Sequence, residues 1–161
     1  MADLLTHVLA AYVLLTVAGW RVGWLEPRWV VVGMGGAAIP DLVKVERLVD
    51  EGVVQSALGV PFEYDPVSSL AGVLVIAGVI TLFFGHARRR VYALLVTGGL
   101  SSLVLDGLRV YVDGSSSFWL YPLWWRPPTP SLYVTADARV AVVAMAVSIG
   151  VFVVDRYAVA S

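Results

Sequence analysis

Four ionisable residues stand beside long apolar stretches, where charge is costly: His7, Asp41, Asp106 and Asp137. Imidazole nitrogen and carboxylate oxygen are donors that bind zinc or manganese in proteins. A metal ion with an open coordination position activates bound water, so hydrolysis needs no nucleophile from the protein. The sequence predicts a divalent metal site, zinc or manganese, with these four residues as ligands. His7, Asp41 and Asp106 are its predicted catalytic residues.

Each of these residues also has a purely structural explanation. Asp41 and Asp137 precede expected helices, and aspartate is a favoured N-cap residue. Asp106 could pair with Arg109, three residues on, or accept a hydrogen bond from Ser102. The histidine could be an ordinary side chain at a membrane interface. The residue types alone leave both explanations open.

The composition is far from that of an ordinary soluble domain. Of 161 residues, 59% are hydrophobic and 14% are charged, with a mean hydropathy of +0.83. Soluble domains carry about 25% charged residues. We therefore expect one integral-membrane domain, residues 1–161, in contact with a lipid bilayer. The net charge of -1 gives no basic surface for nucleic acid, and the lack of cysteine excludes disulfides and thiolate metal sites.

Apolar segments set the expected architecture. A membrane helix needs about 20 apolar residues, and four segments approach that length, at about 4–20, 67–85, 91–111 and 138–154. A fifth, at 29–40, covers only about 18 Å, and its glycines at 33, 35 and 36 suit close helix packing. The sequence predicts an all-α polytopic bundle of about five membrane segments, the second of them short.

Two connecting segments carry patterns of their own. Residues 41–59 place apolar and charged side chains on different faces, which predicts one amphipathic helix along the membrane interface. Residues 113–137 are rich in proline, serine and aromatics. We expect this segment to be an ordered loop at headgroup level, covering the candidate site.

Charge and tryptophan positions predict the orientation in a cytoplasmic membrane. Cytoplasmic loops of membrane proteins are rich in Lys and Arg, which places Arg88, Arg89 and Arg90 inside. With five spans the N-terminus lies outside and the C-terminus inside. The six tryptophans then fall into two interfacial belts: Trp20, Trp24 and Trp29 inside, and Trp119, Trp124 and Trp125 outside. The four candidate ligands all fall near the outer leaflet.

Short motifs in sequence order resemble a known family. "LLTHVLAAY", "GGAAIPDL", "DPVSSLAG", "GGLSSLVLDGL" and "LYPLWWRPPTPSLY", followed by a further Asp, resemble the LexA-regulated, membrane-bound metal-dependent hydrolases of the inner membrane. The resemblance runs from Thr6 to about Asp137. It implies a multi-pass protein with a metal site and a hydrolytic role. His7, Asp41 and Asp106 match the family's histidine and aspartate positions.

The chain departs from that family at two presumed ligands. Ser68 and Ser102 stand where the family has histidine, and a serine hydroxyl is not among the usual ligands of zinc. Two functions therefore stay open. One is hydrolysis of a lipid or cell-envelope ester. The other is a non-catalytic relative, whose buried polar groups form a helix-packing network or a pocket for a lipid or small molecule. A proton or ion pathway fits less well, because no acid lies between residues 70 and 85 or between 91 and 105.

Overall fold

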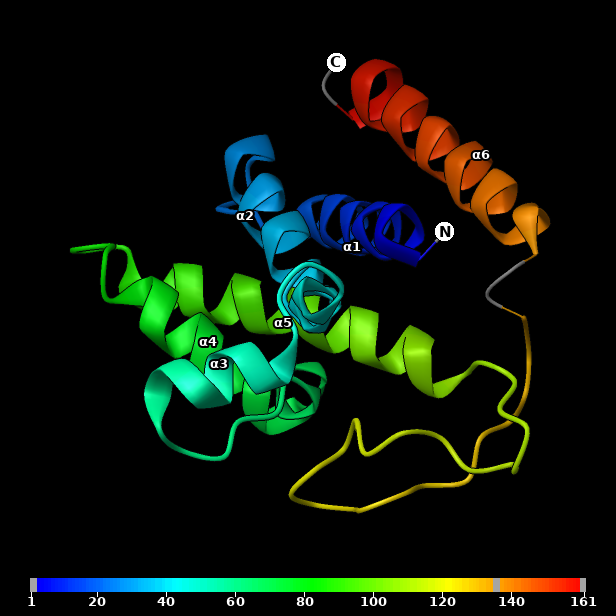
Figure 1. The fold of residues 1–161 in the computed structure, drawn as a ribbon. Helices are drawn as coiled ribbons and strands as arrows, with labels where there is room; N and C mark the ends of the chain where they lie inside the picture. Colours follow the sequence, from blue (N-terminus) through cyan, green and yellow to red (C-terminus); the bar gives the residue numbers. More distant parts are fainter. Residues whose placement is uncertain (1–2, 135–136, 160–161) are drawn as a thin grey trace.

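The computed structural model describes residues 3–134 and 137–159, and its regular structure is helical. The elements are α1 (Asp3–Gly19), α2 (Pro27–Ala37), the 3-10 helix η1 (Pro40–Arg47), α3 (Glu51–Leu58), the 3-10 helix η2 (Asp65–Ser68), α4 (Leu70–Thr81), α5 (Arg88–Gly107), α6 (Ala138–Val154) and the π-helical turn η3 (Asp155–Val159) (Figure 1). Within the described residues, extended structure amounts to two isolated β-bridges. The all-helical part of the prediction is confirmed.

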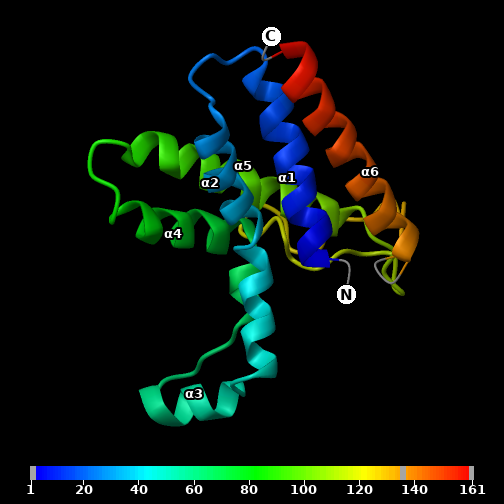
Figure 2. The ribbon, with the colours of Figure 1, turned by 90° about the horizontal axis from the view of Figure 1, so that it is seen from above.

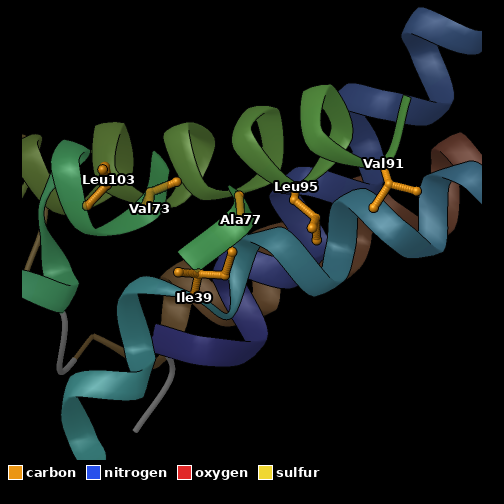
Figure 3. Close-up of a cluster of buried hydrophobic side chains, with 6 residues drawn as sticks. All are labelled: Ile39, Val73, Ala77, Val91, Leu95 and Leu103. Atoms are coloured by element: carbon orange, nitrogen blue, oxygen red, sulfur yellow. The ribbon is translucent and has the colours of Figure 1, made fainter. Parts of the chain in front are cut away.

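The long helix α5 is the centre of the packing. It packs against α1, α2 and α4, while α6 packs against α1. The main buried cluster joins α5 to α4 and to the end of α2 (Figure 3), with side chains from Ile39, Val73, Ala77, Val91, Leu95 and Leu103. A smaller cluster of Leu15, Val30 and Leu94 joins α1, α2 and α5. The first, second and fifth helices thus form one packed unit.

Glycine permits direct backbone contact between α2 and α5. A Cβ atom at Gly98 would lie 1.8 Å from the carbonyl oxygen of Gly33, and one at Gly36 would lie 2.2 Å from the carbonyl oxygen of Leu95. Neither position can carry a larger side chain without moving a helix. Of the three glycines predicted to pack closely, Gly33 and Gly36 do so. A Cβ at Gly35 would meet nothing within 4 Å.

The predicted five-span bundle is wrong. Among the described residues, only the helix over Ala138–Tyr157 is long and apolar enough to cross a membrane. The segment expected at 67–85 starts within η2, and its only α-helix is α4, which the Ser69 hydroxyl caps at the N–H of Gly72 and which ends at Thr81. Its 12 residues rise about 18 Å, against a hydrocarbon core of about 30 Å.

The other expected spans fail through length or charge. Helix α1 has 17 residues and α2 has 11, so they rise about 26 Å and about 17 Å. Helix α5 reaches 20 residues, but three arginines open it and Asp106 lies in its last turn. Hydropathy located the apolar stretches but did not reveal where helices end within them.

The single amphipathic helix expected over 41–59 is also replaced by two elements. It breaks into η1 and α3, and Asp50 caps α3 by accepting a hydrogen bond of 2.8 Å from the N–H of Gly52. Helix α3 has no buried residue and lies away from the other helices (Figure 2). The N-cap residue at position 50 explains the break, since it requires extended backbone there.

We predict that Gly98→Ala destabilises the fold by about 1–3 kcal/mol, because the new methyl group forces α2 and α5 apart. Gly35→Ala is the matched control: its methyl group enters open space, and alanine favours the helix by up to about 1 kcal/mol. Denaturant unfolding in detergent micelles measures both. Equal stability of the two variants would contradict the backbone contact between α2 and α5.

Candidate functional site

The structure places His7 between two of the predicted aspartates. His7 lies in the second turn of α1, and only 2% of its surface is exposed. Its Nδ1 atom is 4.0 Å from Oδ2 of Asp41, and its Nε2 atom is 3.5 Å from Oδ1 of Asp106. Three of the four predicted site residues therefore meet, although they come from α1, η1 and α5.

Each aspartate also has a cationic partner. Nζ of Lys44 is 2.6 Å from Oδ1 of Asp41, and Nη1 of Arg109 is 3.2 Å from Oδ1 of Asp106. The side chains follow one another as Lys44, Asp41, His7, Asp106 and Arg109, which we call the ionic chain. Opposite charges next to one another stabilise both carboxylates in a half-buried position.

Local sequence explains how Asp41 and Asp106 reach this place. Pro40 is buried at the start of η1, and its fixed φ directs the chain into the new helix just before Asp41. Asp106 lies in the last turn of α5, which ends at Gly107. A Cβ atom at Gly107 would lie 2.7 Å from the indole of Trp119. The loop after α5 thus packs directly against the end that carries Asp106.

Hydroxyl groups from this loop hold the end of α5. The last carbonyl groups of a helix lack partners within it, and here they accept hydrogen bonds from tyrosine and threonine. The bonds run from Tyr133 to Leu105 at 2.8 Å, from Tyr111 to Asp106 at 3.2 Å, and from Thr129 to Gly107 at 3.0 Å. Arg109 in turn donates to the Tyr111 hydroxyl at 2.9 Å. The loop thereby fixes the backbone that presents Asp106 and Arg109.

Sequence reasoning missed Lys44 and the three hydroxyl residues of the loop. Lys44 lies three residues after Asp41, a spacing typical of helical ion pairs, so the sequence did carry a signal for it. No short-range pattern links Tyr133 to Leu105, 28 positions earlier. That contact depends on how the loop folds back.

The fourth predicted residue, Asp137, has a capping role. Its side chain accepts a hydrogen bond of 2.9 Å from the N–H of Arg139 and forms the N-cap of α6. This is the structural explanation that the sequence left open. The geometry thus reduces the candidate site to His7, Asp41 and Asp106.

The two serines at the family's histidine positions occupy different surroundings. Ser68 Oγ donates to the carbonyl oxygen of Asp65 at 3.0 Å. Ser102 is fully buried one turn before Asp106, and its hydroxyl has no hydrogen-bond partner in the part of the chain that the structure describes. Of the two, only Ser102 lies on the face of α5 that carries Asp106.

The donor atoms do not fit a zinc site with three protein ligands. Nδ1 and Nε2 point to opposite sides of an imidazole ring, so the two aspartates cannot share one metal ion with it. Within residues 3–134 and 137–159 no group of three His, Asp or Glu side chains is placed to hold a metal ion. Lys44 and Arg109 already neutralise the carboxylates. Zinc or manganese here remains a prediction from the sequence.

Comparison with known proteins gives no independent guide, because no family model, no curated protein and no solved structure matches this chain.

A second aspartate–arginine pair lies exposed in the loop. Arg126 donates to the carboxylate of Asp113, and the N–H of Ser115 donates to it as well. The hydrogen bond from Arg126 and, after it, that from Ser115 hold the pKa of Asp113 below its usual value. This pair provides an exposed comparison for the half-buried pair of Asp106 and Arg109.

We predict that Asp106→Asn destabilises the protein by about 1–3 kcal/mol, because Arg109 and His7 lose a charged partner in a half-buried place. The loss should shrink in an Arg109→Gln background, by a coupling of about 0.5–3 kcal/mol. Asp113→Asn, which removes the exposed carboxylate, should change stability much less. Denaturant unfolding of the wild type, Asp106→Asn, Arg109→Gln and the double variant measures the coupling, with Asp113→Asn as the control. Additive effects of the substitutions at positions 106 and 109 would rule out the ionic chain as a stabilising unit.

Proposed function

We propose that the protein is a membrane-anchored, lipid-binding helical protein in which the ionic chain fixes helix packing. The observation that carries the proposal is the helix over Ala138–Tyr157, which has 20 residues and a mean hydropathy of 2.0. Only 6% of it is buried by the rest of the protein. Its length of about 30 Å matches the hydrocarbon core of a bilayer.

Two common explanations for an apolar helix of this length fail here. A core helix of a soluble domain would be mostly buried, and a signal sequence would lie near the N-terminus. Instead, Val142, Val143 and Ile149 are each about 60% exposed. A large exposed apolar surface is typical of a site of contact with protein or membrane. Acyl chains can contact such a surface around the whole helix.

Apolar grooves continue this surface over α1. One groove of 370 Å³ runs between α1, α5 and α6 and includes Leu14, Leu105 and Val147. Another, of 410 Å³, lies between α1 and α5 and includes Leu100 and Val104. Grooves of this size and character suit acyl chains better than polar metabolites, because a polar ligand would lose its hydrogen bonds to water there.

Within this proposal the ionic chain has a mechanical role. It joins α1 to η1 through Asp41 and to α5 through Asp106. These polar contacts are directional, so they fix how α1, η1 and α5 lie against one another more tightly than apolar contacts alone. Buried ionic groups have such a specificity role in some systems.

Hydrolysis of a lipid or envelope ester is the second candidate. It is favoured by one specific observation: Nδ1 of His7 and Oδ2 of Asp41 are buried and have no hydrogen-bond partner among the described residues. Buried polar atoms normally have partners, so this pair has capacity for a bound water or a substrate group. A histidine next to a carboxylate is the usual form of a general base.

We predict that Val147→Lys releases the protein from membranes under extraction with urea at neutral pH, where the lysine is charged. Lysine at the middle of a membrane helix costs about 2.5–3.5 kcal/mol, and Val147 lies near the middle of the candidate span. Val112→Lys is the matched control, since Val112 is fully exposed in the loop. Wild-type protein and the control should stay in the membrane pellet. Wild-type protein in the supernatant would refute the anchor.

We predict that the purified protein holds less than one equivalent of zinc or manganese, because its donors do not form a three-ligand site. Elemental mass spectrometry after incubation with each ion measures this, with an Asp41→Asn/Asp106→Asn double variant as the control. One equivalent of metal in the wild type, absent from the double variant, would overturn this prediction. It would also make ester hydrolysis the leading function.

A further inference from the structure

We propose that one end of the molecule binds an anionic phospholipid, with an acyl chain in the groove between α1, α2 and α6 and the phosphate among arginines. This rests on the proposed function, because it requires α6 to lie in a bilayer. We call this region the basic-aromatic end. It comprises Trp20, Arg21, Trp24, Arg28, Trp29, Arg88, Arg89, Arg90 and Arg156.

Contacts join parts of this region that lie far apart in the chain. The guanidinium of Arg90, at the start of α5, lies 5.3 Å from the ring centre of Trp24 and 6.0 Å from that of Trp29. At the end of α6, Asp155 accepts a hydrogen bond of 2.9 Å from Nε1 of Trp20. The ends of α1 and α6 and the starts of α2 and α5 therefore form one surface.

A largely apolar groove opens at this surface. It has a volume of 510 Å³, and its walls include Tyr12, Val30, Met34 and Phe152 from three helices. Trp20, Asp155 and Arg156 line it as well. An apolar cavity with charged and indole groups at one end has the polarity of a phospholipid, whose acyl chain and headgroup require these two environments.

The charge of the basic-aromatic end selects an anionic headgroup. Six arginines stand there against two acids, Glu26 and Asp155, which leaves four positive charges. Glu26 already pairs with Arg28 at 2.9 Å. Arginine binds phosphate oxygens through two N–H groups at once, and basic residues beside a membrane attract anionic lipids.

The aromatic residues argue for a lipid over a soluble phosphate compound or an acidic peptide. Trp and Tyr gather at the boundary between headgroups and acyl chains, and three of the six tryptophans lie at this end. Trp24 is 40% exposed, so its ring is available to a membrane surface. A soluble phosphate would use the arginines but would leave the groove and the indole rings without a partner.

Quenching of tryptophan by brominated lipid tests the inference directly, because Trp20 lines the groove. Full-length protein is reconstituted in phosphatidylcholine vesicles that contain an equal mole fraction of either dibrominated phosphatidylglycerol or dibrominated phosphatidylcholine. We expect stronger quenching by the anionic lipid, with the difference reduced at high salt as charges are screened.

Three variants locate the effect. Arg90→Gln should lower the preference for the anionic lipid by up to about fivefold, the factor that corresponds to about 1 kcal/mol per basic residue near a membrane. Arg90→Lys should keep it, because the charge remains. Arg139→Gln removes the same charge at the far end of α6 and should leave the preference unchanged.

The outcomes separate this inference from the proposed function. Equal quenching by the two brominated lipids would overturn the anionic site and leave the membrane anchor intact. No quenching by either lipid would overturn the membrane proposal itself. A preference that falls equally in Arg90→Gln and Arg139→Gln would show that overall charge, and not this end of the molecule, selects the lipid.

Discussion

The contact between the backbones of α2 and α5 is the constraint on which the rest of the structure depends. Gly33 and Gly98 allow the two helices to touch without side chains between them. Because α2 is held so close, the chain that leaves it through Pro40 stays beside α5, and Asp41 comes within reach of the same histidine as Asp106. A wider separation of the two helices would leave His7 with only one of its two carboxylates.

The sequence was a better guide to which polar residues lie together than to the architecture, and the reason is physical. His7, Asp41 and Asp106 could be selected because charge in apolar surroundings needs a partner, and three such residues in one chain are natural partners. The number of membrane spans could not be read in the same way. Hydropathy averages over a window, whereas the end of a helix depends on single residues such as Ser69, which caps α4 and shortens an apolar stretch.

The remaining parts of the site depend on contacts that local sequence does not encode. The loop after α5 supplies the hydroxyls of Tyr111, Thr129 and Tyr133 to the end of that helix. The sequence around each of these residues carries no signal for a hydrogen bond to α5. The bond forms only because the loop folds back onto the end of that helix. The N-cap role of Asp137, by contrast, was visible in the sequence as an alternative, because aspartate before an apolar helix is a common cap.

The distribution of polar groups along the helices links the ionic chain to the proposed membrane setting. Helix α1 begins near His7 and ends beside Trp20, and α5 begins at the arginines and ends at Asp106. Both helices therefore carry their acidic and basic side chains near the ends, with no Asp, Glu, Lys, Arg or His between them. Helix α6 has the same pattern, from Asp137 to Asp155, and its last residues are tied to Trp20. Polar groups at helix ends are common in any environment, because the end groups of the backbone need partners. For α6, which is long and apolar enough to cross a membrane, the same pattern also suits the bilayer of the proposed function. The ionic chain gives Asp41 and Asp106 a cationic neighbour each, so that neither acid stands in its half-buried place as an uncompensated charge.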